Sequence, residues 1–233
     1  SLILLGAITL VLLFVREPTA PANPASSGPR QGLLRNLREV LESEDRSGFW
    51  ILAAILCWFL GFNALETWIS SFGKFTLGID PGRMSLITSG FALLFVIFAV
   101  PSGLFATRFG RKRTILGGVV ALTVLMAMGW LVRDTLSLVA LLVAAGIAWA
   151  LVNVNSLPMV YDVGGDARVG AFTGLYYLAS NIAAVGGPQV VGLLIDWTGG
   201  NYRVMFLFSA IFMALATLCM TRVREHPRPS ASR

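Results

Sequence analysis

The sequence predicts an all-α, polytopic membrane protein, and three observations lead to this fold class. Of the 233 residues, 56% are hydrophobic and 13% are charged, whereas soluble domains carry roughly 25% charged residues. The mean hydropathy is +0.76, and the apolar residues gather in runs long enough for helices that cross a hydrocarbon core about 30 Å thick. None of these runs shows the strict alternation of a transmembrane barrel strand.

Residue types that carry catalytic or metal chemistry are scarce. Cys57 and Cys219 lie inside apolar runs and His226 is the single histidine, so we expect no disulfide framework and no metal site. No zinc-protease motif or phosphate-binding P-loop occurs, and we therefore expect neither an enzyme nor a cofactor. The net charge of +6 comes from basic residues between apolar runs, which does not predict a nucleic-acid partner.

Two segments are expected before the main bundle. The first apolar run, within residues 1–15, is too short for a full span and predicts a truncated transmembrane helix, so we expect the C-terminal part of something longer. Residues 16–48 are expected to form a cytoplasmic linker, with prolines between Glu17 and Pro29. Apolar residues at helical spacing follow over 33–41 and predict an amphipathic helix on the membrane face, or else a short solvated helix.

Residues 49–222 are expected to form a bundle of six transmembrane helices, followed by a cytoplasmic tail over 223–233. Each run has the length of a span, and together they cover 49–72, 85–107, 114–132, 136–157, 169–195 and 204–221. If every run crosses the membrane, the loops and tails on one side carry 14 Lys and Arg residues and the loops on the other carry four. This bias predicts an integral plasma-membrane or inner-membrane protein, in contact with lipid, with its C-terminus in the cytoplasm.

The loop between the second and third full runs carries the most specific motif, GLFATRFGRKR over residues 103–113. Four cations would by themselves anchor two helices at the cytoplasmic face. The spacing also resembles the signature loop of the major facilitator superfamily, with Thr107 in place of its acidic residue, and the matching and adjacent positions are Gly103, Arg108, Gly110, Arg111, Lys112 and Arg113. Physically, Gly103 would permit a close helix approach, Gly110 a tight turn, and the cations would pair with helix C-termini or lipid phosphates.

This resemblance implies that the chain is a six-transmembrane-helix half of a major facilitator fold plus a truncated preceding helix. The six full runs correspond to helices 7 to 12 of the family. Residues 108–112 and the stretch from Asn155 to Gly170 also resemble, more weakly, the glycoside/cation and sucrose–proton symporter branch. The implied partners are a missing N-terminal six-helix half, a small-molecule substrate and protons.

Polar residues inside the spans mark candidate positions on a substrate or proton pathway, because placing them in lipid is costly. On the first full run they share one helical face, with Asn63, Glu66, Thr67 and Ser70 at positions i, i+3, i+4 and i+7. On the fifth full run, Tyr177 and Asn181 are the corresponding candidates. For the amide and hydroxyl groups, contacts between helices are an equally reasonable role, whereas the Glu66 carboxylate requires water or a partner.

Two further sites are candidates for a gate or a hinge. Asn155 and Pro158 mark the inner end of the fourth full run and predict a gate or cavity floor. Gly186, Gly187 and Pro188 predict a break or a kink in the fifth, which would act as a hinge or remain a plain kink.

The function expected from these observations is secondary active transport by alternating access. We expect a small polar solute, with a sugar favoured, and coupling to protons, because amide, hydroxyl and aromatic groups suit polyols. Two alternatives remain: a drug or lipid exporter of the same superfamily, and a membrane scaffold or receptor that transports nothing.

Overall fold

The computed structural model describes residues 46–164 and 169–224, and these ranges contain six α-helices. In order they are α3 (Ser47–Leu77), α4 (Pro81–Phe109), α5 (Arg111–Gly129), α6 (Thr135–Gly164), α7 (Val169–Trp197) and α8 (Val204–Arg222). All six are long and apolar enough to cross a membrane, which confirms the all-α, six-span prediction. The expected truncated helix, the amphipathic helix and nearly all of the tail lie outside the described residues.

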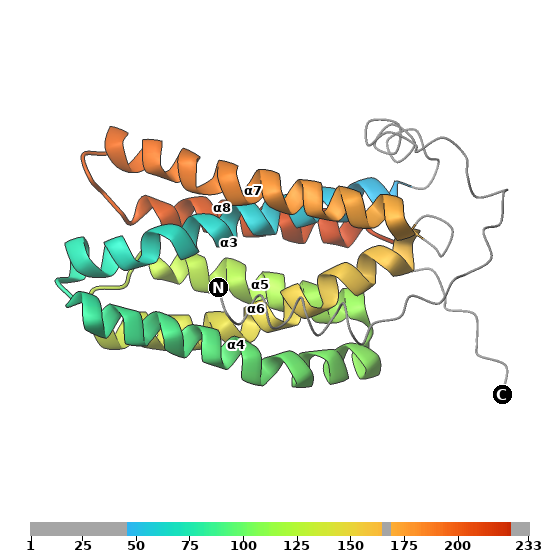
Figure 1. Ribbon diagram of the computed structural model, residues 1–233, viewed down its shortest axis with the longest axis horizontal. Helices are drawn as coiled ribbons and strands as arrows, with labels where there is room; N and C mark the ends of the chain where they lie inside the picture. Colours follow the sequence, from blue (N-terminus) through green and yellow to red (C-terminus); the bar gives the residue numbers. More distant parts are fainter. Residues whose placement is uncertain (1–45, 165–168, 225–233) are drawn as a thin grey trace, which may run out of the picture. The chain divides into compact units, whose positions relative to one another are not determined.

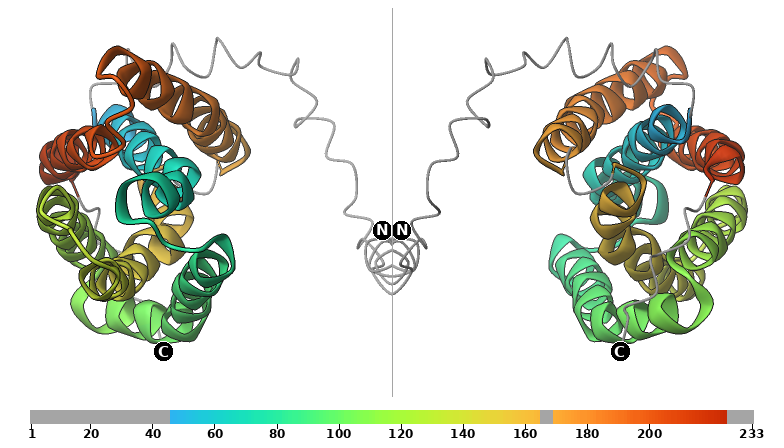
Figure 2. Two further views of the ribbon diagram at one scale, coloured as in Figure 1. Left: turned by 90° about the vertical axis from the view of Figure 1, so that its left-hand side faces the viewer. Right: turned by 90° about the vertical axis from the view of Figure 1, so that its right-hand side faces the viewer.

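The six helices run side by side along the long direction of the bundle (Figure 1). Seen end-on, α3 lies between α7 and α8, and α6 lies between α4 and α5 (Figure 2). The extensive contacts follow the same order: α3 packs on α8 and α7, α6 packs on α5 and α4, and α5 packs on α8. The bundle core consequently lies on α3, α5, α6 and α8, whereas α4 and α7 bury much smaller shares of their surfaces.

The helix ends form two groups, one at each end of the bundle. At the end that we call the basic end, Arg111 contacts Asp162, Lys112 contacts the Val223 carbonyl, and the Arg224 N–H donates to Ser47 Oγ. At the opposite end, the Phe75 and Tyr202 rings stack with centroids 5.6 Å apart. Successive helices therefore alternate in direction, as six consecutive spans require.

Helices α5 and α8 close each other's C-terminal ends. The Lys112 ammonium, at the start of α5, donates to the Val223 carbonyl at 2.5 Å and to the Thr221 carbonyl at 3.4 Å. Arg203, directly before α8, donates through Nη1 to the carbonyls of Val132 at 2.5 Å and Trp130 at 2.8 Å. The last carbonyls of a helix lack intrahelical partners and favour cations, so this pair of contacts stabilises both ends of the antiparallel α5–α8 pair.

Candidate functional site

A cavity of about 530 Å³ opens between α3, α4 and α6. Four of its lining side chains are polar, namely Glu66, Ser70, Thr88 and Asn153. The others are apolar or aromatic: Phe62, Leu65, Ile69, Phe91, Ala92, Phe95, Leu142 and Trp149. A mostly apolar pocket with a few polar groups is the usual composition of a small-molecule site.

Helical spacing explains why Glu66 reaches this cavity. Phe62, Glu66 and Ser70 follow one another at intervals of four residues on α3, so their side chains form one row. Among the described residues, no hydrogen bond or ion pair engages the Glu66 carboxylate. Thr88, across the cavity on α4, already donates its hydroxyl hydrogen toward the carbonyls of Met84 and Ser85, each at 3.1 Å. The carboxylate is therefore available to a bound solute or proton.

Aromatic rings build the wall next to Glu66. The rings of Phe62 and Trp149 stack face to face, with centroids 3.8 Å apart and planes at 4°. Phe91 stacks on the same Phe62 with a centroid distance of 6.0 Å, and Phe59 meets the Trp149 ring edge-on at 5.6 Å. This cluster joins α3, α4 and α6, and so fixes the wall of the cavity on three helices.

The structure separates the residues that the sequence grouped as one pathway. Glu66 and Ser70 line the cavity, whereas Asn63 and Thr67 are not among its lining residues; Asn63 donates to the Phe59 carbonyl at 2.7 Å. Tyr177 and Asn181 lie on α7 with exposed side chains, and Asn181 donates to the Tyr177 carbonyl at 2.7 Å. Tyr177 and Asn181 are thus not among the residues that line the Glu66 cavity.

Several cavity residues were missed by sequence reasoning. Phe91, Phe95, Leu142 and Trp149 lie in apolar runs where nothing distinguishes them from lipid-facing residues. Thr88 lies about two turns into α4, between Ser85 and Ser89, and nothing in the sequence distinguishes its hydroxyl from theirs. The one sequence signal was the spacing of residues 88, 91 and 95 on a common helical face.

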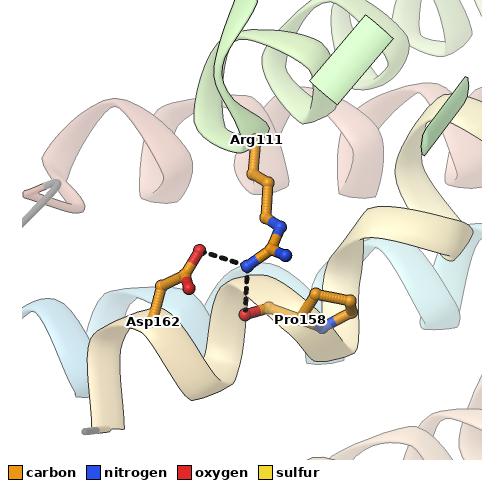
Figure 3. Close-up of polar contacts among 3 residues, drawn as sticks. All are labelled: Arg111, Pro158 and Asp162. Carbon is orange, nitrogen blue, oxygen red and sulfur yellow. Dashed lines mark hydrogen bonds and ion pairs between the residues drawn. The ribbon is translucent and has the colours of Figure 1, made fainter. Parts of the chain in front are cut away.

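The signature loop lies at the basic end, and two of its predicted roles are met. Gly110 connects α4 to α5 with φ of +91°, a conformation that favours glycine. The Arg111 guanidinium donates from Nη1 to Asp162 Oδ2 at 2.6 Å and to the Pro158 carbonyl at 3.3 Å, near the C-terminal end of α6 (Figure 3). With Lys112 on the end of α8, two cations of the loop pair with helix C-termini as predicted.

The other positions of the loop behave differently. A Cβ on Gly103 would meet no described atom within 4 Å, so the predicted close helix approach is wrong within the six helices. Arg108 lies 5.5 Å from the Phe109 ring centroid and Arg113 is exposed. Both are therefore left facing outward at the basic end.

Asn155 and Pro158 lie in an uninterrupted α6. The buried Asn155 amide donates to Ser102 Oγ at 3.1 Å, and Ser102 donates to the Ala150 carbonyl at 2.9 Å. These contacts connect α4 to α6, so the structure places Asn155 in a helix contact. Its role as a gate remains a prediction.

Of the break or kink expected at Gly186, Gly187 and Pro188, the break is wrong, because α7 is continuous from Val169 to Trp197; the kink and its role as a hinge stay predictions. The small residues instead permit close packing on α3: a Cβ on Gly187 would lie 2.5 Å from the Leu60 carbonyl oxygen. The Pro188 carbonyl accepts a hydrogen bond from Trp68 Nε1 at 3.0 Å. The segment therefore holds α7 against α3.

Six antiparallel helices that are long and apolar enough to span a membrane define an integral membrane protein, and one cavity between them carries a carboxylate. The sequence profile of the Major Facilitator Superfamily matches residues 74–233, and the chain belongs to this family.

Individual proteins agree with this assignment. The chain is 28% identical over 141 residues to the MFS-type transporter ppzB of Metarhizium majus, and 27% identical over 169 residues to human monocarboxylate transporter 7. These matches cover 59% and 71% of the chain but 30% and 32% of the relatives. The crystal structure of the E. coli fucose–proton symporter FucP superposes with a TM-score of 0.76 at 13% identity, over 96% of this chain and 53% of FucP. The chain thus spans about a third of these relatives and about half of the solved transporter.

Proposed function

We propose that the chain is the C-terminal half of a secondary active transporter, and that the complete protein moves a small solute by alternating access. The family membership and the coverage of about half of FucP support this proposal. In transporters of this kind the solute site lies near the bilayer midplane between two repeats that rock against each other. The missing partner is then the preceding six-helix half.

The observation that carries the proposal is the position of Glu66. Its carboxylate lies within a membrane-spanning helix, lines a cavity and engages no described residue. Ionisable residues inside spans mark ion, proton or substrate pathways. We assign to Glu66 the uptake and release of a proton during transport.

Two cargo classes follow from the cavity. A sugar or other small polar solute is supported by Ser70 and Asn153 in the lining, and FucP is itself named a fucose–proton symporter. A more apolar solute, as in an exporter, is supported by the aromatic and aliphatic side chains that make up the rest of the wall.

The test of the coupling assignment is uptake by the complete transporter in vesicles with an imposed proton gradient. Glu66→Gln keeps the shape of the side chain but cannot titrate, so we expect gradient-driven accumulation to be lost while solute exchange persists. Glu66→Asp should retain coupling at a lower rate. Asp196→Asn, at the exposed end of α7, is the matched control and should transport as wild type. Equal accumulation by wild type and Glu66→Gln, with one pH profile, would refute the assignment.

We further propose that the basic end faces the cytoplasm, as the positive-inside bias favours. Single cysteines introduced in a Cys57→Ser, Cys219→Ser background report this directly. In intact cells an impermeant maleimide should label a cysteine at Asp134 and fail to label one at Arg113. Labelling at Arg113 from outside would reverse the orientation. Cysteines at Glu66 and Ser70, which line the cavity, would favour a scaffold that transports nothing if they stayed inaccessible to water in the complete protein.

A further inference from the structure

A second, wholly apolar hollow adjoins the Glu66 cavity. It measures about 290 Å³ and lies between α4 and α6, with the lining residues Leu86, Ile87, Gly90, Leu94, Val139 and Val143 besides two shared ones. Phe91 and Leu142 line both hollows. We call this second hollow the α4–α6 groove. The two side chains are therefore the partition between a carboxylate-bearing cavity and a groove with no polar side chain.

Gly90 keeps the groove open. A Cβ on this residue would meet no described atom within 4 Å, so the groove extends over a position where another residue type would place a side chain. Glycine in a helix interior costs about 1 kcal/mol relative to alanine, and no described atom within 4 Å of the Cβ position requires a glycine there. The groove is suited to a flexible apolar chain.

The adjoining cavity favours a positive charge. Glu66 is the single ionisable group among the described residues that line it. The rings of Phe62, Phe91 and Trp149 lie beside it, and aromatic faces attract organic cations once these are desolvated. Burying a cation in an apolar environment without a partner costs free energy. A carboxylate with aromatic neighbours offsets this cost.

We propose that this half of the transporter recognises an amphiphilic organic cation, with its charged head in the Glu66 cavity and its alkyl tail in the α4–α6 groove. The inference rests on the proposed function, since it takes the Glu66 cavity as the solute site. The bond that joins the head to the tail would lie at the partition formed by Phe91 and Leu142. The substrate class is thus a single-chain quaternary ammonium or protonated amine.

Other solute classes fit the same walls less well. A free anion would place its charge beside Glu66, with no cationic side chain among the described lining residues. A bare sugar carries more hydroxyl groups than Ser70 and Asn153 can pair with, and each buried hydroxyl without a partner costs free energy. Thr88 offers no free donor, because its hydroxyl hydrogen is directed to backbone carbonyls. Neither class uses the groove.

The experiment measures binding to the full chain in nanodiscs of neutral phosphatidylcholine, by equilibrium dialysis against empty discs. Three probes separate head from tail: dodecyltrimethylammonium has both, tetramethylammonium has the head alone, and dodecyl maltoside has the tail with a neutral sugar head. Glu66→Gln removes the charge, with Asp196→Asn as its control. Gly90→Leu fills the groove, and Gly117→Leu is its control because a Cβ there also meets nothing within 4 Å.

We expect dodecyltrimethylammonium to bind at least tenfold more tightly than either other probe. Glu66→Gln should abolish its preference over dodecyl maltoside, and Gly90→Leu should reduce its affinity to that of tetramethylammonium; both controls should match wild type. Equal binding of the cationic and the neutral dodecyl probes by wild type would overturn the inference. A Gly90→Leu variant that binds the probe as tightly as Gly117→Leu does would also overturn the inference. The alkyl tail would then not occupy the groove, which would hold a lipid acyl chain only. Because no gradient is used, failure here leaves the coupling test with Glu66 unaffected.

Discussion

Substituting alanine at two neighbouring glycines of α7 separates steric contact from helix propensity. Gly186 and Gly187 are both helical, so each replacement gains roughly 0.5–1 kcal/mol from the reduced freedom of the unfolded chain. At Gly186 the new Cβ would lie 3.6 Å from a methyl group of Leu60, an ordinary contact. At Gly187 it would lie 2.5 Å from the Leu60 carbonyl oxygen and 3.3 Å from the carbonyl carbon. That oxygen belongs to the backbone of α3 and cannot rotate away.

The magnitude follows from the difference between these two sites. Overpacking a closely packed contact costs about 1–3 kcal/mol, while the propensity gain is common to both variants and cancels. Gly187→Ala should therefore be less stable than Gly186→Ala by about 1–3 kcal/mol, and Gly186→Ala should be at least as stable as wild type. The displaced α7 would also strain the hydrogen bond from Trp68 Nε1 to the Pro188 carbonyl.

The assay is reversible unfolding of the purified chain in mixed micelles by titration with dodecyl sulfate, followed by far-ultraviolet circular dichroism. Tryptophan emission, to which Trp68 and the other five tryptophans contribute, is recorded in the same samples. Equal unfolding midpoints for Gly186→Ala and Gly187→Ala would refute the prediction, because a Cβ placed against the Leu60 carbonyl would then not destabilise the protein.

Three further predictions concern the contacts between helices and the loop at the opposite end. Ser102→Ala removes the buried hydroxyl that contacts Asn155 and the Ala150 carbonyl, and it should lower the unfolding free energy by about 1 kcal/mol. The control Ser89→Ala, at an exposed position on the same helix, should leave the unfolding free energy unchanged, and equal losses in the two variants would contradict the prediction. A double-mutant cycle of Arg111→Met with Asp162→Asn should give a coupling energy of about 0.5–1 kcal/mol, because both side chains are about one-third exposed; a coupling energy of zero would remove the ion pair from the stabilising contacts. Hydrogen bonds from the Ser137 N–H and hydroxyl hold the pKa of Asp134 below its usual range. Their contribution to stability is therefore fully present above the unfolded-state pKa and is lost as the pH falls through the lower folded-state pKa. Asp134→Ala should accordingly lower the Tm at neutral pH and leave it unchanged in strong acid, while Asp134→Asn, which retains a capping oxygen, should flatten the pH dependence; a pH-independent effect of Asp134→Ala would contradict the linkage.

Much of the fold was predictable because hydrophobic length in a membrane is a strong constraint. All six runs became helices, and the differences lie at their ends. Helix α3 continues past Phe72 to Leu77, and α6 continues past Pro158 to Gly164. Polar residues such as Lys74 and Asp162 end an apolar run but need not end a helix, since the chain outside the hydrocarbon core can remain helical.

The candidate site was only partly predictable, because helical spacing gives a face but not its neighbours. Glu66 and Ser70 were identified from their polarity and their four-residue spacing. Trp149, which stacks on Phe62, lies among aliphatic residues in an apolar run, where a tryptophan does not by itself indicate a cavity, and its distance along the chain from Phe62 hides the contact. The error at Gly187 has a related origin: a glycine that permits close helix packing and a glycine that breaks a helix look alike in sequence.

The contacts that α5 and α8 exchange at their ends have a consequence for biosynthesis. During membrane insertion α5 is made well before α8. The carbonyls of Trp130 and Val132 therefore lack the Arg203 donor, and Lys112 lacks the Val223 carbonyl, until α8 has been made. Helix α3, the first of the six, likewise finds its most extensive contacts with α8 and α7, the last two. Helices α4, α5 and α6 can pack on one another early, but the faces of α3 and α5 that contact α8 stay uncovered by this chain until its final helix enters the bilayer.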